Sequence, residues 1–329
     1  DSKEMTADAL TEIALEAEAA GLSVPGVSKS GGAGASWRLA GVVLATSHGF
    51  EGAYMTSRHG MSMTAVAGDG TGMERDYDFD SRTFFEDLES PADIGRRAGE
   101  RAVRRLNPQK LSTRTTNVIY ESRAARSILG HLTGAINGAS IARKTSFLKD
   151  RMGEAVFAPG IRVVDDPFKR RGAATRPFDG EGTAASVLNM IEDGVLQHWF
   201  LDGASARELG LSPNGRAHRS GSGTSPGATN ITLMPGEKSL QALMAEAGSG
   251  LLVSDLIGHG VNGVTGDYSR GAAGFWFENG DIVEPVSEIT IAGNLNDMFK
   301  RLVPGSDLDN RYSAATPSVM IEGMALAGS

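Results

Sequence analysis

The stretch around which this chain is organised runs from Gly258 to Pro285 and reads GHGVNGVTGDYSRGAAGFWFENGDIVEP. It holds seven glycines, and each one inside a helix would cost roughly 1 kcal/mol relative to alanine. The pattern therefore predicts a glycine-rich loop, Gly258–Gly274, that leads into a β-hairpin. The aromatic run Phe275–Phe277 forms the first strand, residues 278–281 the turn, and Ile282-Val283 the returning strand.

The predicted loop carries polar side chains suited to a peptide or another polar ligand. The candidate substrate or interface residues are His259, Asn262, Asp267, Tyr268, Ser269 and Arg270. Tyr268 would offer a stacking face, and Arg270 a cation for an interface or a peptide carboxylate. Two alternatives remain: a plain surface connection in which Tyr268 packs locally and Arg270 caps a carbonyl, and a proton relay between His259 and Asp267.

Composition narrows the classes of function. The chain has 329 residues, a formal net charge of −8 and no cysteine. The negative charge argues against direct nucleic-acid binding. The lack of cysteine excludes disulfides, thiolate metal sites and a cysteine nucleophile, and fits a cytoplasmic location. No apolar run approaches the ~20 residues of a membrane span, and the first residues lack the apolar core of a signal peptide.

The first part of the chain predicts a helix followed by an antiparallel meander. The helix covers Ala7–Ala20, with Thr6 as its N-cap. A loop is expected over Val24–Gly34, and core positions at Val42–Leu44 and Ala53–Met55. The four predicted strands are Ser36–Thr46, Gly52–His59, Met61–Gly68 and Met73–Phe79.

Carboxylates alternate with aromatics in Asp76-Tyr77-Asp78-Phe79-Asp80. This resembles the start of a calcium loop, but the alternation also fits a strand with aromatics inside and carboxylates in solvent. A helix follows over Pro91–Leu106, and its five arginines indicate a solvated face or, alternatively, a nucleic-acid contact.

Asn107-Pro108 ends that helix and marks a domain boundary. The expected domains are 1–107, with its start missing, and 108–329. The second domain predicts a helix over Ala124–Thr133, an irregular segment over Gly210–Pro226 and a hairpin turn at Asp193-Gly194. Hairpins without regular βαβ alternation predict an α+β fold with large, mostly antiparallel sheets.

Four long stretches resemble the TldD/PmbA family, whose members were once called modulators of DNA gyrase. They begin at Asp165 (DDPFKRRGAATRPFDGEGTAA), Asp202 (DGASARELGLSPNGRA), Thr229 (TNITLMPG) and Val264 (VTGDYSRGAAGFWFENGDIVEPVSEITIAGNL). The chain looks closer to the PmbA/TldE branch than to the TldD branch, and the likeness extends from about Gly31 onward. It implies a preceding segment of about a hundred residues before this chain in such proteins.

The TldD branch carries an HExxxH metal motif that this sequence lacks. None of the six histidines lies within ten residues of another. The resemblance places Gly130, His131 and Ala135 where that motif would have His, Glu and His, in that order. It therefore implies no catalytic residue, metal or cofactor in this chain, with zinc expected only in a TldD-like partner.

Other catalytic schemes find little support in the sequence. Ser222 lies in a flexible Gly/Ser-rich segment. Asp179 and Glu181 offer either an acid–base pair or a turn.

The resemblance implies a subunit of a TldD-type metalloprotease complex that acts on unfolded peptides, in peptide maturation and antitoxin degradation. We expect dimerisation through the second domain, with the loops Gly215–Gly227 and Gly258–Gly274 facing a shared cavity. The alternatives are a non-catalytic homodimeric peptide-binding protein and an independent hydrolase.

Overall fold

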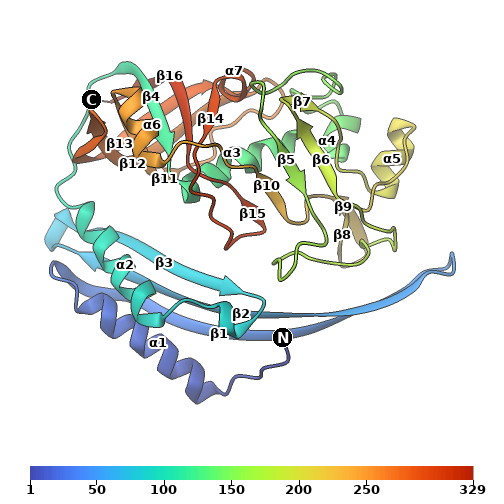
Figure 1. Ribbon diagram of the computed structural model, residues 1–329, viewed down its shortest axis with the longest axis horizontal. Coiled ribbons are helices and arrows are strands. Elements are labelled where there is room, and N and C mark those ends of the chain that lie inside the picture. Colours follow the sequence, from blue (N-terminus) through green and yellow to red (C-terminus); the bar gives the residue numbers. More distant parts are fainter. Residues whose placement is uncertain (329) are drawn as a thin grey trace. The chain divides into compact units, whose positions relative to one another are not determined.

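The computed structural model describes residues 1–328, so only Ser329 of the expected second domain lies outside the described residues. Contacts divide the chain into two units. The first comprises Asp1–Val42 and Ala53–Gln109, and the second comprises Val43–Gly52 with the chain from Lys110 onward. Helices combine with mostly antiparallel strands, which confirms the α+β class (Figure 1).

The first unit is a three-stranded sheet with two helices against one face (Figure 1). Its strands, in sheet order, are β1 (Val27–Ala45), β2 (Glu51–Ala67) and β3 (Glu74–Arg82). Its helices are α1 (Ala7–Leu22) and α2 (Pro91–Arg104). Thr6 caps α1 as predicted, because its side chain accepts a hydrogen bond from the Ala9 N–H. The small core consists of alanines and Met63 between sheet and helices.

Several predictions for this sheet are wrong. The expected loop Val24–Gly34 is mostly strand, because β1 begins at Val27. The two strands expected on either side of Gly60 are one continuous strand, β2. Val43 and Met55, placed in the core by their apolar character, are 84% and 68% exposed. Apolar alternation identified the strands correctly, but no other part of the described chain covers these two side chains.

The carboxylates of β3 point inward, which reverses the predicted faces of that strand. Asp76, Asp78 and Asp80 are buried, whereas Tyr77 is exposed. Asp78 accepts hydrogen bonds from the Arg97 Nε at 2.6 Å and from an Arg101 guanidinium nitrogen at 2.8 Å.

Arg105 approaches Asp76 at 3.4 Å. The arginines at 97, 101 and 105 are four residues apart and therefore share one face of α2. Part of the predicted solvated face of α2 therefore forms ion pairs with β3. The aspartates that alternate along β3 are the partners of these arginines, which does not support the calcium-loop alternative.

The second unit is built on a six-stranded sheet in the order β13-β12-β11-β4-β16-β14. A further pairing of β13 with β16 closes five of these strands into a ring. Only β4 and β11 run parallel among its pairings. The strands are β4 (Arg114–Tyr120), β11 (Ser249–Ile257), β12 (Asp267–Glu278), β13 (Asp281–Asn294), β14 (Leu302–Pro304) and β16 (Val319–Ala327).

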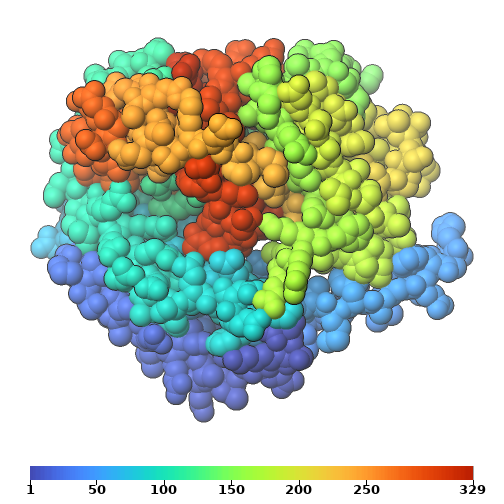
Figure 2. All heavy atoms as spheres, in the orientation of Figure 1, coloured from blue at the N-terminus to red at the C-terminus, as the bar shows by residue number. Residues whose placement is uncertain are grey.

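Successive residues of these strands face two different cores, as strand geometry requires. Ile119, Leu252 and Phe277 pack with α6 (Leu240–Ala247), which is the orange helix at the surface in Figures 1 and 2. Their neighbours along the strands, among them Tyr120 and Val253, pack in the larger core with α3 (Ser122–Ala135). Both faces of this sheet are covered, so the sequences of these strands contain continuous apolar runs without alternating polar residues.

A five-stranded sheet in the order β15-β10-β5-β6-β7 and a two-stranded hairpin complete the unit. The strands are β5 (Val163–Asp165), β6 (Leu188–Glu192), β7 (Val195–Leu196), β8 (Ala217–Ser220), β9 (Gly223–Pro226), β10 (Ile231–Leu233) and β15 (Ala314–Ala315), and the remaining helices are α4 (Gly138–Ala142), α5 (Gly203–Leu209) and α7 (Leu295–Lys300). The expected irregular segment Gly210–Pro226 therefore contains the hairpin β8–β9.

A buried ion pair that the sequence did not reveal stabilises this region. Arg216 is fully buried and donates its Nε to Asp165 at 2.5 Å. Asp165 also accepts from the Thr229 N–H and hydroxyl. Such a charge is retained in a core only when its partners satisfy it, so this pair is structural.

The two predicted hairpin turns are confirmed. Asp193-Gly194 joins β6 to β7 with φ angles of 47° and 77°, and Asn279-Gly280 joins β12 to β13 with 51° and 89°. Two successive positive φ values define the turn that matches strand twist, and Asn-Gly and Asp-Gly adopt it most readily.

Candidate functional site

The predicted loop lines an open hollow of about 670 Å³ in the second unit. Its walls are His259, Gly260, Val261, Asn262, Gly263, Asp267, Tyr268 and Ser269. The structure thus brings five of the six candidate residues together at one surface feature. Arg270 is not among the lining residues. The connection is shorter than predicted, because β12 begins at Asp267 and leaves only residues 258–266 outside the strands.

Side-chain hydrogen bonds hold this short loop in one shape. The Asn262 side-chain oxygen accepts from the Val264 N–H at 2.9 Å. Asp267 accepts from the Thr265 hydroxyl at 2.6 Å and from the Asn294 amide at 3.0 Å. These two hydrogen bonds, Thr265 first, lower the pKa of Asp267.

Asp267 is therefore a charged anchor of the loop at neutral pH. Its two oxygens are engaged by Thr265 and Asn294, and no hydrogen bond joins it to His259 within residues 1–328. The arrangement does not support a His259–Asp267 relay. His259 and Ser269 are exposed, and their side chains form no hydrogen bond with any other residue from 1 to 328.

Tyr268 does not offer the stacking face that the sequence suggested. It is only 2% exposed, and its hydroxyl lies 3.3 Å from the hydroxyl of Tyr120 on β4. Its ring meets the ring of His131 edge-on, with centroids 5.8 Å apart. Burial raises the pKa of Tyr268. The local-packing alternative therefore describes Tyr268. Arg270 donates its Nε to the Ile257 carbonyl at 3.2 Å, which engages one of its three guanidinium nitrogens.

Helix α3 does not present a metal-ligand set. The positions that the family resemblance aligned with the motif are Gly130, His131 and Ala135, and Gly130 has open space where a side chain would project. In the described part of the chain, no group of three His, Cys, Asp or Glu side chains is arranged to hold a metal ion. Since a protein zinc site normally needs three or four such ligands, these residues do not fit one.

His131 is the titratable residue of α3, and its environment keeps it neutral. Burial, and then the charge of Arg270, lower the pKa of His131 to about 4. Its Nε2 is buried and has no hydrogen-bond partner among the described residues. The contact of His131 with Tyr268, which lies on β12, could not be inferred from local sequence pattern.

Asp179 and Glu181 are structural residues of a turn. Asp179 accepts hydrogen bonds from three backbone N–H groups, those of Glu181, Thr183 and Ala217. Glu181 accepts from the Gly203 N–H at 2.7 Å and from the Thr224 hydroxyl at 3.0 Å. Carboxylates occupied in this way are not free to exchange protons with a substrate. Ser222 is exposed in the turn between β8 and β9.

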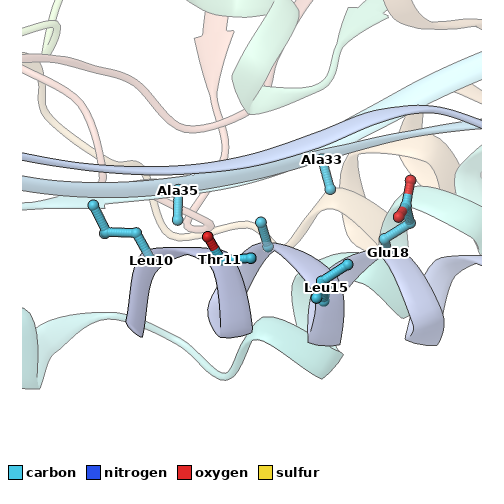
Figure 3. A pocket seen from close by; sticks show the side chains of 7 residues that line it. Leu10, Thr11, Leu15, Glu18, Ala33 and Ala35 are labelled. Carbon is cyan, nitrogen blue, oxygen red and sulfur yellow. The ribbon is translucent and has the colours of Figure 1, made fainter. Parts of the chain in front are cut away.

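A smaller hollow of about 230 Å³ lies in the first unit between α1 and β1. Figure 3 shows Leu10, Thr11 and Leu15 of α1 facing Ala33 and Ala35 of β1. The space exists because the strand carries small side chains there. Glu18 is its only ionisable lining residue, so we assign no chemistry to it.

The fold defines a class of two-unit α+β proteins, and comparison with known proteins identifies the family. Residues 1–106 match the PmbA/TldA metallopeptidase central domain, and residues 113–328 match the PmbA/TldA metallopeptidase C-terminal domain. The chain belongs to the TldD/PmbA family of metallopeptidases.

Individual relatives agree with this assignment. The chain is 38% identical to the metalloprotease PmbA of Escherichia coli O157:H7, over 99% of this chain and 71% of that protein. It is 39% identical to a PmbA homologue of Haemophilus influenzae, over 98% of this chain and 70% of that protein.

A solved structure shows the same fold. It is a proposed modulator of DNA gyrase from Bacteroides thetaiotaomicron, with a TM-score of 0.91 and 27% identity over 99% of this chain and 72% of that one. No helix in the described residues is long and apolar enough to cross a membrane.

Proposed function

We propose that this chain is a PmbA/TldE-like subunit of a TldD-type metalloprotease complex that acts on unfolded peptides. The proposal rests on a difference between the family of this chain and the residues of its helix α3. The chain belongs to a metallopeptidase family, yet α3 holds one histidine and no carboxylate. A TldD-like partner would then supply the metal and the hydrolytic step, while this chain would supply fold, interface and substrate contacts in the cytoplasm.

The hollow of the second unit supports a role in holding peptide main chain. Gly260 and Gly263 are exposed on its rim. Their N–H groups donate to no other backbone or side-chain group of residues 1–328. Free backbone donors on a rigid loop can pair with an extended peptide without reading its side chains. This suits an enzyme complex whose substrates share an unfolded state and not a sequence.

Reconstitution tests the proposal. A TldD-family chain carrying HExxxH is co-expressed with this chain, and complex formation is measured by co-purification. Degradation of a fluorescent unfolded peptide is then followed with each chain alone and with the mixture, with and without a chelator. We expect a complex and activity in the mixture alone, abolished by the chelator. Activity of this chain by itself would identify an independent hydrolase, and peptide binding by a homodimer without any complex would identify a binding protein.

A variant of the hollow refines the test. His259→Ala removes an exposed side chain from the lining without disturbing a hydrogen bond of the loop. His48→Ala is the matched control, because His48 is also exposed and does not line the hollow. We expect weaker peptide turnover, by several-fold, for the first variant only. Equal turnover for both would show that the His259 side chain does not contact substrate.

A further inference from the structure

Three elements of the second unit bring a group of polar side chains together on the α3-facing side of β12. Tyr268 and Arg270 are two residues apart on β12 and therefore share one face of that strand. Tyr120 of β4 meets Tyr268 through their hydroxyls, and His131 of α3 packs edge-on against the Tyr268 ring. We call these four residues the α3–β12 cluster.

This cluster contains a cation and no anion. Within residues 1–328, Arg270 forms no ion pair, and its recorded hydrogen bond runs from Nε to the Ile257 carbonyl. That bond leaves the two terminal nitrogens of the guanidinium unengaged. Helix α3 has no acidic residue along its length. A guanidinium normally uses its planar donors on a carboxylate or phosphate, so this one lacks its usual partner.

His131 adds a second unsatisfied group. The Nε2 atom of His131 is buried and has no hydrogen-bond partner among the described residues. The Nδ1 atom also forms no hydrogen bond with these residues, but it is not among the buried atoms. Burial and the positive charge of Arg270 hold the pKa of His131 at about 4. Arg270 also acts against the rise in pKa that burial imposes on Tyr120 and Tyr268. The positive charge of Arg270 therefore acts on the pKa of all three neighbours.

We propose that Arg270 and His131 form a binding site for the C-terminal carboxylate of a peptide. This rests on the proposed function, in which the chain handles peptides. Two parallel N–H groups of Arg270 match the two oxygens of a carboxylate. Nδ1 of His131 supplies a further donor on the accessible side of the ring. One cation beside one neutral imidazole balances a single negative charge, which favours a carboxylate over a phosphate dianion.

The proposal makes the His131 ring a reporter of occupancy. A carboxylate beside Arg270 cancels the charge that repels a proton from His131, so the pKa of His131 rises by about one unit or more on binding. An N-acetylated tripeptide with a free C-terminal carboxylate is titrated into the chain and compared with the same peptide as its C-terminal amide. Imidazole ¹⁵N resonances are followed against pH, with the His131 signals assigned from His131→Gln.

We expect the free acid to raise the pKa of His131 and to bind about ten-fold more tightly than the amide. Arg270→Gln should abolish this preference and raise the pKa of His131 in the unliganded chain. Arg219→Gln is the matched control, because Arg219 likewise donates its Nε to a carbonyl, that of Gly180, at 2.8 Å. This control should leave the preference intact.

Equal binding of acid and amide, absence of binding, or an unmoved His131 resonance would each overturn the carboxylate site. Those results would leave the proposed function standing if the reconstituted mixture still degrades peptide. Conversely, the chain could prefer the free acid while the reconstituted mixture degrades no peptide. That result would support the carboxylate site and contradict the proposed function.

Discussion

The hydroxyl of Tyr120 lies 3.3 Å from the hydroxyl of Tyr268, although 148 residues separate them along the chain. The two tyrosines stand on β4 and β12, which flank β11 in the sheet. Both are buried, so the pair links the strand that follows the glycine-rich loop to the centre of the larger core. Tyr268 is therefore a structural residue. A variant that tests the function of the loop should leave Tyr268 unchanged, because its substitution would also alter the stability of the core.

We expect Tyr268→Phe to lower the free energy of unfolding by about 1 kcal/mol, because it removes one buried hydrogen bond and keeps the ring. Tyr268→Ala should cost about 3–5 kcal/mol, since it also leaves a cavity. Urea unfolding measures both. Tyr77→Phe is the control, because Tyr77 is 48% exposed, and should be nearly neutral. A Tyr268→Ala variant as stable as this control would contradict the burial of the ring.

Asp78 is predicted to be the most sensitive residue of the first unit. Asp78→Asn removes the charge that two arginines of α2 share, and we expect a loss of about 3 kcal/mol, as for other buried ion pairs broken on one side. Asp93→Asn is a matched change, because Asp93 pairs with Arg96 on the exposed side of the same helix. It should cost at most about 0.5 kcal/mol. Similar losses in urea unfolding for both variants would show that burial does not strengthen the Asp78 pair.

Stability should depend on pH through His131. Its pKa is about 4 in the folded chain and about 6.5 when unfolded. The unfolded chain therefore binds more protons between these values, and the stability that a neutral His131 provides above pH ~6.5 is lost as the pH falls toward 4.

His131→Gln should remove this contribution. Between pH 7 and pH 5 the wild-type chain should lose on the order of 1–2 kcal/mol more than the variant, allowing for partial solvent screening. Guanidinium unfolding at the two pH values measures the difference. Parallel losses in both proteins would mean that His131 titrates normally in the folded state.

Zinc should not bind stoichiometrically to this chain. His131 is a single potential ligand on α3, and a stable zinc site needs three or four. After dialysis against zinc and removal of excess metal, elemental analysis should find far less than one zinc per chain, with no change in His131→Ala. One equivalent of zinc that disappears in His131→Ala would contradict this expectation and require ligands from elsewhere in the protein.

Local sequence was most informative where conformation depends on adjacent residues. Asp193-Gly194 and Asn279-Gly280 were identified as hairpin turns because few other dipeptides accept two successive positive φ values. Capping and apolar spacing predicted the Thr6 cap and helices over Ala7–Ala20 and Pro91–Leu106. The structure has these helices at Ala7–Leu22 and Pro91–Arg104. The loop that lines the hollow was also found from its glycines and polar residues.

The direction in which side chains face was less predictable. Alternation on Glu74–Arg82 correctly indicated a strand, but Asp78 faces inward because arginines on a later helix meet it there. Apolar Val43 and Met55 predicted a core that no described segment provides. Period is a property of the strand itself, whereas the choice of the buried face depends on what packs against it.

The sequence by itself determined the α+β class, the turns, the family likeness and the absence of a histidine pair on α3. Only the tertiary structure decided that Tyr268 is buried, that His131 lies against it, and that the charge of Arg270 acts on both. Within residues 1–328, Arg270 forms no ion pair with a carboxylate. Turns and helix ends are set by the dihedral preferences of neighbouring residues. Burial and charge pairing arise between residues on different elements, from Asp78 and Arg97, 19 positions apart, to Tyr120 and Tyr268, 148 positions apart. No local pattern indicates which of them will meet.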